Sequence, residues 1–357
     1  MKAITVIPGK AGVSLSDLND VQQQPNSVKV KTLYTGICGT DREITAGRLG
    51  ITRPEAGNSL VLGHEAVGVI ESASYKSDFS AGDIVVPMVR RPGGCVNCRD
   101  GRQDYCLDGD FNEAGIRGKN GFMREYFYED PKFLIKVSNS ANAAVCVMSE
   151  PTKNIMKILE AVVSVSKRPF WDLSGGLDGK GVWIFGTGAE GLLASAVFKN
   201  AGADTVLANR RSLVGAELAV SQKTGSKVFD SSKDDIDALI NDINMDVVID
   251  TVGVPKILED CIPRLNRNGI VVLFGTGGQG VSSLLDGGAI IRLVDKNATI
   301  VGCEDGCHDN YVQAVKFIEE QHDHYGLDQI ITGHYGNDQL DVLREKIAGE
   351  IKCVIDW

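Results

Sequence analysis

Four side chains in the first half of the chain are of the types that bind zinc. Cys38 lies in the segment Gly-Ile-Cys-Gly-Thr-Asp, His64 and Glu65 belong to a Gly-His-Glu segment, and Glu150 comes directly before a proline. Zinc takes thiolate, imidazole and carboxylate ligands, and a catalytic zinc keeps one position open for water or substrate. Taken singly, each residue has a structural alternative, since a lone cysteine is often a small buried hydrophobe. Together they predict a catalytic zinc site. The sequence leaves open whether Glu65 and Glu150 ligate the zinc at the same time or in alternation.

Three further cysteines lie close together in a loop rich in glycine and charge. Cys95 and Cys98 are separated by two residues, and Cys106 follows shortly after. This spacing is typical of a structural zinc site, which needs four ligands. A carboxylate can complete the tetrahedron, and we favour Asp110 for this role. The other candidates are Asp104 and Asp108. The alternative is that this lobe holds no metal and that its three thiols are free.

A glycine-rich loop in the second half of the chain has the form of a phosphate-binding loop. It reads Gly186-Thr187-Gly188-Ala189-Glu190-Gly191, and it follows a predicted strand at 182–185 and opens a predicted helix at 192–198. That context is the one required for dinucleotide binding. The first glycine allows a tight turn, the second lets the backbone approach the pyrophosphate, and the third allows close helix packing. The alternative is a glycine-rich turn without a function.

The segment Asn209-Arg210-Arg211 follows the second predicted strand after this loop. NAD enzymes carry an acidic residue at this place, where it accepts hydrogen bonds from the adenosine ribose 2′-hydroxyl. Two guanidinium groups and an amide suit a 2′-phosphate instead, because arginine offers bidentate charge-assisted hydrogen bonds and no acid remains in the segment to repel the phosphate. We therefore predict a preference for NADP, with NAD tolerated. The alternative is that the arginines form a solvated face at a helix start.

The first part of the chain has the pattern of a mainly-β lobe. Up to about residue 130, short β-branched runs such as 28–33 and 66–70 alternate with glycine, proline and asparagine. From Pro151 onward, apolar residues recur at helical spacing. Glu150 is therefore expected at the start of a helix.

The second part alternates strands with helical segments. The strand at 182–185 is followed by predicted strands at 206–208, 247–250 and 270–274. This alternation predicts an α/β fold with a parallel, doubly wound sheet. A helix at 311–320 and a last strand at 351–355 are expected at the end of the chain.

Composition is that of an ordinary globular protein. The chain has 357 residues, 43% of them hydrophobic and 24% charged, and this length favours two domains. A formal net charge of −10 argues against a nucleic-acid partner. The N-terminus reads as a first strand and no apolar run is long enough to span a bilayer, so we predict a cytoplasmic protein without a membrane partner. Nine cysteines, an odd number, fit a reducing compartment.

The order of these segments resembles the zinc-dependent medium-chain dehydrogenase/reductase family. The segments that carry the resemblance are Cys-Gly-Thr-Asp at Cys38, Gly-His-Glu at His64, and the Gly-Asp-Ile-Val-Val run that starts at Gly82. The resemblance implies a GroES-like, mainly-β catalytic domain joined to a Rossmann domain, with catalytic zinc on Cys38 and His64. The family's lobe zinc has four cysteines, and Pro92 stands here where the first of them would be.

Within that family the chain is similar to the archaeal-type glucose 1-dehydrogenases. The similarity lies in 85–92, 113–116, 121–125, 149–151 and 349–352, together with the Asn-Arg-Arg segment. It implies oxidation of β-D-glucose at C1 to gluconolactone with hydride transfer to NADP, in the non-phosphorylated Entner–Doudoroff route. Zinc would act there as a Lewis acid on the C1 hydroxyl. The resemblance also suggests a homotetramer in which the last strand of the Rossmann sheet pairs between subunits.

The resemblance assigns further site residues by position. Thr40 would touch the reacting hydroxyl and start a proton relay, and Glu113 would accept hydrogen bonds from ring hydroxyls, beside Glu150, Asn154 and Asp305. Cofactor contacts are also predicted for Phe274, Gly275, Thr276 and Lys352. Relatives can carry Asn at Val89, Asp at Asn154 and Asn at Asp305. These departures leave room for galactose or xylose as substrates.

The predicted division places residues 1–154 and 306–357 in the catalytic domain and 155–305 in the NADP-binding domain. Two other functions compete with the aldose dehydrogenase. One is a zinc-dependent polyol or secondary-alcohol dehydrogenase of the same superfamily. The other is a non-catalytic NADP-binding protein, against which the retained set Cys38, His64, Glu65 and Glu150 argues.

Overall fold

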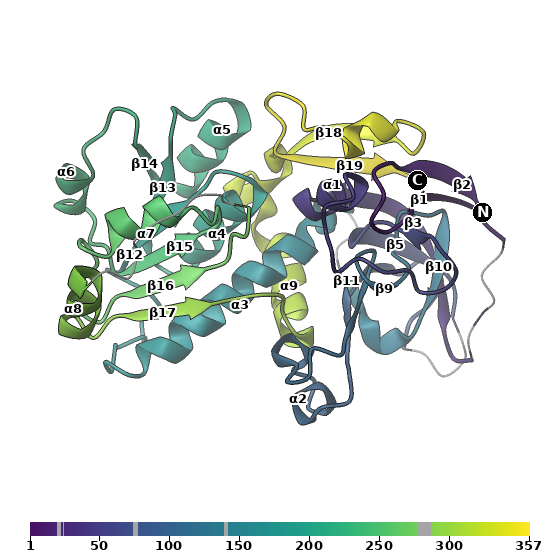
Figure 1. The fold of residues 1–357 in the computed structure, drawn as a ribbon, viewed down its shortest axis with the longest axis horizontal. Helices are drawn as coiled ribbons and strands as arrows, with labels where there is room; N and C mark the ends of the chain where they lie inside the picture. The colour runs from purple at the N-terminus through teal and green to yellow at the C-terminus, as the bar shows by residue number, and fades with distance from the viewer. Residues whose placement is uncertain (20–22, 24, 74–77, 139–141, 278–286) are drawn as a thin grey trace. The chain divides into compact units, whose positions relative to one another are not determined.

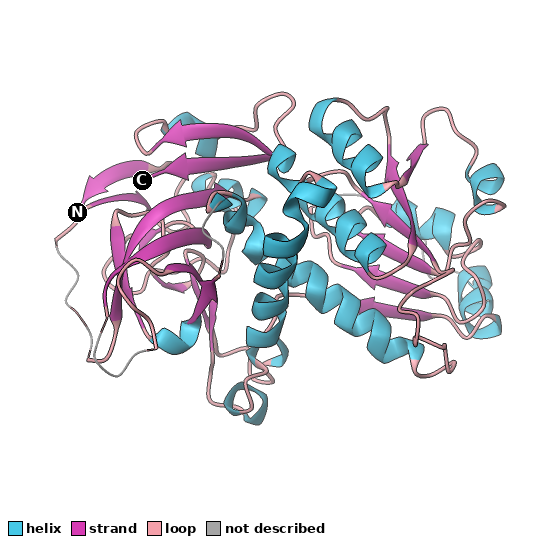
Figure 2. Ribbon diagram, turned by 180° about the vertical axis from the view of Figure 1, so that it is seen from behind, coloured by secondary structure: helices cyan, strands magenta, loops and turns pink. Residues whose placement is uncertain are grey.

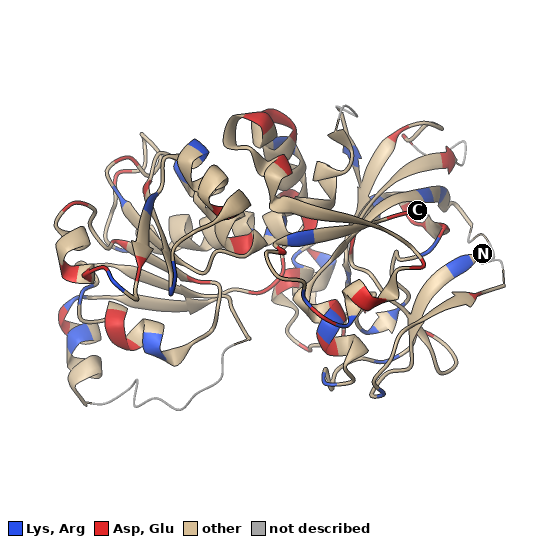
Figure 3. Ribbon diagram, turned by 90° about the horizontal axis from the view of Figure 1, so that it is seen from above, with Lys and Arg blue, Asp and Glu red and all other residues tan. Residues whose placement is uncertain are grey.

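The computed structural model describes residues 1–19, 23, 25–73, 78–138, 142–277 and 287–357. The chain folds as two compact units. The first comprises residues 1–153, 306–322 and 331–357, and the second comprises 154–305 and 323–330. Among the described residues, no helix has the length and apolar character that crossing a membrane requires. Figure 3 shows acidic and basic residues interspersed along the ribbons of both units.

The first unit is built on antiparallel sheets (Figure 1). The largest has the strand order β11-β6-β5-β3-β19-β18, and β10 also pairs with β3. These strands are β3 (Val28–Ile37), β5 (Glu65–Ser72), β6 (Ile84–Pro87), β10 (Tyr126–Glu129), β11 (Leu134–Val137), β18 (Ile331–Gly336) and β19 (Lys352–Asp356). Within the described part of this sheet, β18 and β19 are the one parallel pair, and they belong to the C-terminal segment that returns to this unit.

Two small sheets and several helices complete the first unit. One sheet holds β2 (Ser14–Asp17), β1 (Lys2–Val6) and β4 (Leu60–Val61), and the other holds β7 (Arg90–Arg91), β8 (Asn112–Ala114) and β9 (Gly118–Lys119). The helices are α1 (Gly39–Thr45), α2 (Val96–Arg99) and most of α9 (His308–Tyr325). Buried β-branched and aromatic side chains such as Val30, Ile70 and Phe127 form the core between the strands. The predicted mainly-β domain is confirmed.

The second unit is a six-stranded parallel sheet in the order β14-β13-β12-β15-β16-β17. The strands are β12 (Gly181–Phe185), β13 (Asp204–Asn209), β14 (Lys227–Asp230), β15 (Val247–Asp250), β16 (Ile270–Leu273) and β17 (Thr299–Gly302). The helices are α4 (Ala189–Asn200), α5 (Gly215–Thr224), α6 (Ile236–Ile240), α7 (Pro255–Cys261) and α8 (Gly287–Asp295). This strand order is that of the doubly wound dinucleotide-binding fold, which confirms the predicted Rossmann architecture. Figure 2 shows the strands as one sheet with helices beside it.

Helix α3 (Ser149–Ser166) begins in the first unit and continues in the second. Glu150 lies in its first turn, as the apolar spacing predicted. The segment 323–330, which the prediction placed in the catalytic domain, belongs to the second unit. The physical reason is that Leu327 and Ile330 are fully buried there, while Lys223 of α5 donates a hydrogen bond to the carbonyl of Asp323.

Candidate active site

The pairing of β3 with β5 brings three of the predicted zinc ligands together. Gly36 lies opposite Glu65 in this pair, so Cys38, just past the end of β3, comes next to His64 and Glu65 at the start of β5. The ligand atoms of these three residues all lie within 4.8 Å of one another. An added Cβ at Gly36 would lie 2.0 Å from Glu65 Oε2, so only glycine fits beside this carboxylate. A thiol, an imidazole and a carboxylate at this spacing suit zinc.

Asp41 lies beside two of these ligands. Its Oδ2 accepts a hydrogen bond from the backbone N–H of Cys38 at 2.9 Å, and its Oδ1 lies 3.5 Å from His64 Nδ1. Burial by itself lowers the pKa of His64, but Asp41 and the thiol of Cys38 outweigh burial and raise this pKa well above its ordinary value. With Nδ1 facing Asp41, Nε2 is the nitrogen left for a metal. Asp41 is the last residue of the Gly-Ile-Cys-Gly-Thr-Asp segment, but the sequence alone did not predict a role for it.

Lys352 holds Glu65 from the other side. The Lys352 ammonium donates to Glu65 Oε1 at 2.6 Å and to Oε2 at 2.8 Å, and both side chains are almost completely buried. Burial raises the pKa of Glu65, and the positive charge of Lys352 acts against this rise. The prediction had assigned Lys352 to the cofactor. In the structure its ammonium is bound to the carboxylate of the metal group, and a cofactor contact stays a prediction.

Glu150 and Thr40 lie near this group without belonging to it. Glu150 is buried and forms an ion pair with Lys153 at 3.1 Å, and its negative charge acts to raise the pKa of Glu65. The Thr40 hydroxyl lies 3.8 Å from the sulfur of Cys38. Coordination by Glu150 and a proton relay through Thr40 therefore stay predictions.

The glycine-rich loop lies between β12 and α4, where the sequence predicted it. Gly186 has a φ of +108°, and a Cβ at Gly191 would lie 2.0 Å from the carbonyl oxygen of Gly186, so both positions require glycine. Gly188 is the N-cap of α4, and a Cβ there would meet no described atom within 4 Å. The N–H groups in the first turn of an α-helix have no partner within the helix. A pyrophosphate fits such a helix N-terminus.

The loops after β15 and β16 lie at the same edge of the sheet. The backbone N–H groups of Phe274 and Gly275 both donate to the carbonyl of Asp250. A Cβ at Gly275 would lie 2.3 Å from the nitrogen of Val252, so the two loops pack backbone against backbone. Thr276, the next residue, is exposed. In doubly wound folds ligands bind outside this edge, at the carboxyl ends of the strands.

A hydrogen-bonded chain links the glycine-rich loop to the end of β13. Asn209 Nδ2 donates to Thr187 Oγ1 at 2.8 Å, and Thr187 Oγ1 donates to Glu217 Oε1 at 2.7 Å. Glu217 also accepts two hydrogen bonds from Arg211. The segment itself contains no acid, as predicted, but the fold brings Glu217 of α5 against Arg211. Arg210 and Arg211 are exposed.

Comparison with known proteins adds to this geometry. Residues 143–357 match the family model described as glucose dehydrogenase C-terminus, and residues 24–139 match the alcohol dehydrogenase GroES-like domain. A glucose 1-dehydrogenase of Thermoplasma acidophilum is 37% identical over 362 residues, which cover 100% of this chain and 99% of the relative. Another, from Metallosphaera sedula, is 36% identical with the same coverage of both. The chain belongs to the glucose 1-dehydrogenase family. It is an oxidoreductase of the zinc-dependent medium-chain superfamily.

Solved structures agree with this family membership. The glucose dehydrogenase of Haloferax mediterranei, in a complex with NADP, zinc and gluconolactone, superposes with a TM-score of 0.87 at 26% identity, covering 100% of this chain and 99% of that one. The L-idonate 5-dehydrogenase of Escherichia coli gives a TM-score of 0.80 at 20% identity, covering 100% and 98%. The second likeness shows the fold alone.

Beside Thr40 and Glu150, three more residues of this glucose 1-dehydrogenase family member were predicted to bind sugar. Glu113 is buried, with Arg90 donating to Oε1 and Arg117 lying 3.2 Å from Oε2. Asn154 Oδ1 is buried and has no hydrogen-bond partner among the described residues, which is unusual for a polar atom without a ligand. Asp305 is buried and adopts a φ of +58°, a strained conformation that is frequent at binding sites. Their contact with sugar stays a prediction.

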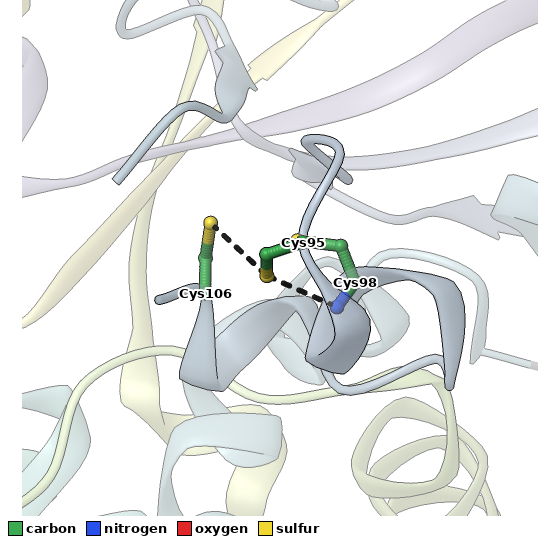
Figure 4. A group of neighbouring side chains, drawn as sticks. All are labelled: Cys95, Cys98 and Cys106. Atoms are coloured by element: carbon green, nitrogen blue, oxygen red, sulfur yellow. Dashed lines mark hydrogen bonds between the residues drawn. The ribbon is translucent and has the colours of Figure 1, made fainter. Parts of the chain in front are cut away.

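The lobe cysteines form a second group of potential metal ligands (Figure 4). Cys95, Cys98 and Cys106 have their sulfurs within 4.8 Å of one another, and the sulfurs of Cys95 and Cys106 lie 3.9 Å apart. Backbone N–H groups of Leu107 and Cys98 donate to the sulfur of Cys95 and lower its pKa to about 7, whereas burial raises the pKa of Cys98 to about 11. The three thiols are placed as a structural zinc requires.

The fourth ligand predicted for this lobe, Asp110, stays a prediction. No carboxylate of the described residues completes the group. Asp104 is bound by Arg102, and Asp110 is exposed. A Cβ at Gly93 would lie 1.9 Å from the carbonyl oxygen of Asp110, so the backbone of Asp110 packs closely against this loop. Asp108 is exposed as well.

Proposed function

We propose that the protein oxidises β-D-glucose at C1 to gluconolactone and transfers hydride to NADP, in a non-phosphorylated Entner–Doudoroff route. The observation that carries the proposal is the group of Cys38, His64 and Glu65, whose ligand atoms lie within 4.8 Å of one another. Support also comes from the Haloferax relative, which binds NADP, zinc and gluconolactone. The glycine-rich loop at the N-terminus of α4 supplies the matching cofactor site.

Each residue of the metal group has a physical role in this proposal. Bound zinc would act as a Lewis acid toward the C1 hydroxyl oxygen, on which negative charge develops as hydride leaves. Asp41 places a negative charge 3.5 Å from His64 Nδ1, and Lys352 donates two hydrogen bonds to the carboxylate of Glu65.

The experiment that tests the function is a comparison of initial rates. Reduction of NADP and NAD is measured with glucose, galactose, xylose and sorbitol, before and after chelation and with zinc added back. Zinc-restorable reduction of NADP with aldoses supports the proposal and ranks the sugars. Activity confined to sorbitol would select a polyol dehydrogenase instead. Oxidation of galactose or xylose would agree with the predicted relaxation of sugar selectivity. That prediction rests on Val89, Asn154 and Asp305, which differ from residues that relatives can carry at these positions.

The preference for NADP rests on the exposed arginines at the end of β13. Changing Arg210→Ala together with Arg211→Ala should raise the Michaelis constant for NADP by about 100-fold, since each lost charge-assisted hydrogen bond contributes about 1.5 kcal/mol. The constant for NAD should change by less than about threefold, because NAD has no 2′-phosphate to lose. Steady-state kinetics with both cofactors measures the two constants, and an equal rise in both would refute the assignment.

We further propose that the chain assembles as a homotetramer. β17 is the last strand in the order of the six-stranded sheet, and an open strand edge pairs readily with another chain. α8, which precedes it, exposes Ile290, Ile291 and Val294, and exposed apolar side chains mark interaction surfaces. Sedimentation analysis tests the proposal, and a monomer at micromolar concentration would contradict it.

A further inference from the structure

Glu217 is a buried carboxylate that the proposed site has not used. It lies in the first turn of α5 and is only 5% exposed. Its oxygens accept hydrogen bonds from Arg211 Nη1 and Nη2 at 2.7 and 2.8 Å, from Thr187 Oγ1 at 2.7 Å, and from the backbone N–H of Val214 at 3.3 Å. Burial raises the pKa of Glu217, but these donors outweigh it and lower the pKa overall. The residue is therefore an anion at neutral pH.

Arg211 keeps part of its guanidinium available in spite of this contact. A guanidinium has five N–H donors. In Arg211, Nη1 donates to the carbonyl of Ser212 and to Glu217, and Nη2 donates once, to Glu217. The Nε–H and the second Nη2–H have no hydrogen-bond partner within the described ranges, and they form one edge of the planar group. The side chain is 56% exposed, so this edge is a two-pronged donor that a phosphate can reach.

Thr187 connects Glu217 to the phosphate-binding loop. Its hydroxyl accepts from Asn209 Nδ2 and donates to Glu217 Oε1, so its single proton is used and its direction is fixed. Asn209 Oδ1 in turn accepts from the backbone N–H of Arg210. One hydrogen-bonded chain thus runs from the segment after β13, through the glycine-rich loop, to the carboxylate that holds Arg211.

We infer that Glu217 determines the preference for NADP by positioning Arg211. Glu217 accepts two hydrogen bonds from one edge of the guanidinium, and this contact orients the other edge toward the 2′-phosphate. This inference rests on the proposed function, in which Arg210 and Arg211 bind that phosphate. Because a long arginine side chain loses much conformational freedom on binding, fixing it beforehand raises the affinity for the ligand. NAD lacks the phosphate and gains nothing from the arrangement.

Glu217 also has a structural role, which the test must separate from positioning. It caps α5, since its side chain reaches back to the backbone N–H of Val214. Glutamine serves equally well at this capping position. Glu217→Gln therefore keeps the cap, but an amide cannot accept two parallel hydrogen bonds from one guanidinium. If Glu217 acted only through its charge, the same change would remove a repulsion and tighten the binding of NADPH.

The experiment measures binding of NADPH and NADH to the full-length protein by fluorescence titration. For Glu217→Gln we expect the dissociation constant of NADPH to rise by about tenfold, as for one lost charge-assisted hydrogen bond, and that of NADH to change by less than about twofold. Asp237→Asn is the matched control, because Asp237 also lies in the first turn of a helix and also accepts two hydrogen bonds from one arginine, Arg264. It should leave both constants unchanged.

Arg211→Ala separates failure of this inference from failure of the proposed function. Suppose that Arg211→Ala weakens the binding of NADPH but not of NADH. If Glu217→Gln then causes no further loss of NADPH affinity in the Arg211→Ala background, the two residues act as one unit and the inference stands. If Arg211→Ala weakens the binding of NADPH but Glu217→Gln alone leaves NADPH affinity unchanged or increases it, the inference is overturned. The assignment of Arg211 to the 2′-phosphate then still holds. If Arg211→Ala changes neither constant, the phosphate assignment itself fails.

Discussion

Replacing Cys38 with alanine should lower kcat with glucose by at least about a thousandfold, because Lewis-acid stabilisation contributes several kcal/mol to the transition state. The thiol is one of the three ligand groups that the described part of the chain brings within 4.8 Å of one another at this site. Its loss leaves His64 and Glu65, a set too small to hold a catalytic zinc firmly. Binding of NADPH should stay within about twofold, since the glycine-rich loop belongs to the other unit.

Cys146→Ala is the matched control for this change. Cys146 is also a buried free thiol of the first unit, but it is not part of either described metal group. Its removal should leave turnover and zinc content close to those of the unchanged protein. Zinc per subunit is measured alongside kcat, and Cys38→Ala should lose one equivalent. Full activity in Cys38→Ala would remove the zinc assignment.

The parts of the site that depend on local sequence could be predicted. The phosphate-binding loop needs only a strand, three glycines and a helix in succession, so its position between β12 and α4 followed from the sequence alone. Glu150 in the first turn of α3 followed from the helical spacing of the residues after it. The central strands of the second unit could also be predicted, because each contains an apolar run between turn residues.

The parts that depend on contacts between distant segments could not be predicted. Lys352 meets Glu65 although 287 positions separate them, and no spacing rule connects a last strand to β5. Glu217 meets Arg211 only because α5 begins beside the end of β13. The sequence assigned Lys352 to the cofactor and gave Glu217 no role, whereas the fold pairs each of them with a charged side chain of the protein.

Edge strands were missed for a different physical reason. β14 and β17 are the outermost strands of the second unit, and β17 alternates between half-buried and exposed positions. An edge strand buries less apolar surface than a central one, so its sequence carries a weaker pattern.

Replacing Lys352 with methionine should destabilise the metal-free protein by about 3–5 kcal/mol, which is the usual cost of leaving one partner of a buried ion pair uncompensated. The side chain of Glu65 is 0% exposed and that of Lys352 only 3%, so water cannot replace the lost ammonium. Methionine fills a similar volume, which separates loss of charge from loss of packing. Thermal and denaturant unfolding of the first unit, followed after chelation, measures the effect.

Two comparisons decide whether the loss comes from the unpaired carboxylate. Adding Glu65→Gln to Lys352→Met removes the unpaired carboxylate, so the double variant should recover much of the lost stability. If it does not, the loss comes from altered packing around Lys352. Zinc supplies a second cation to the same carboxylate, provided that Glu65 is a ligand. Lys352→Met should therefore cost less stability with zinc than without it. An equal cost in both states would show that Glu65 does not bind the metal.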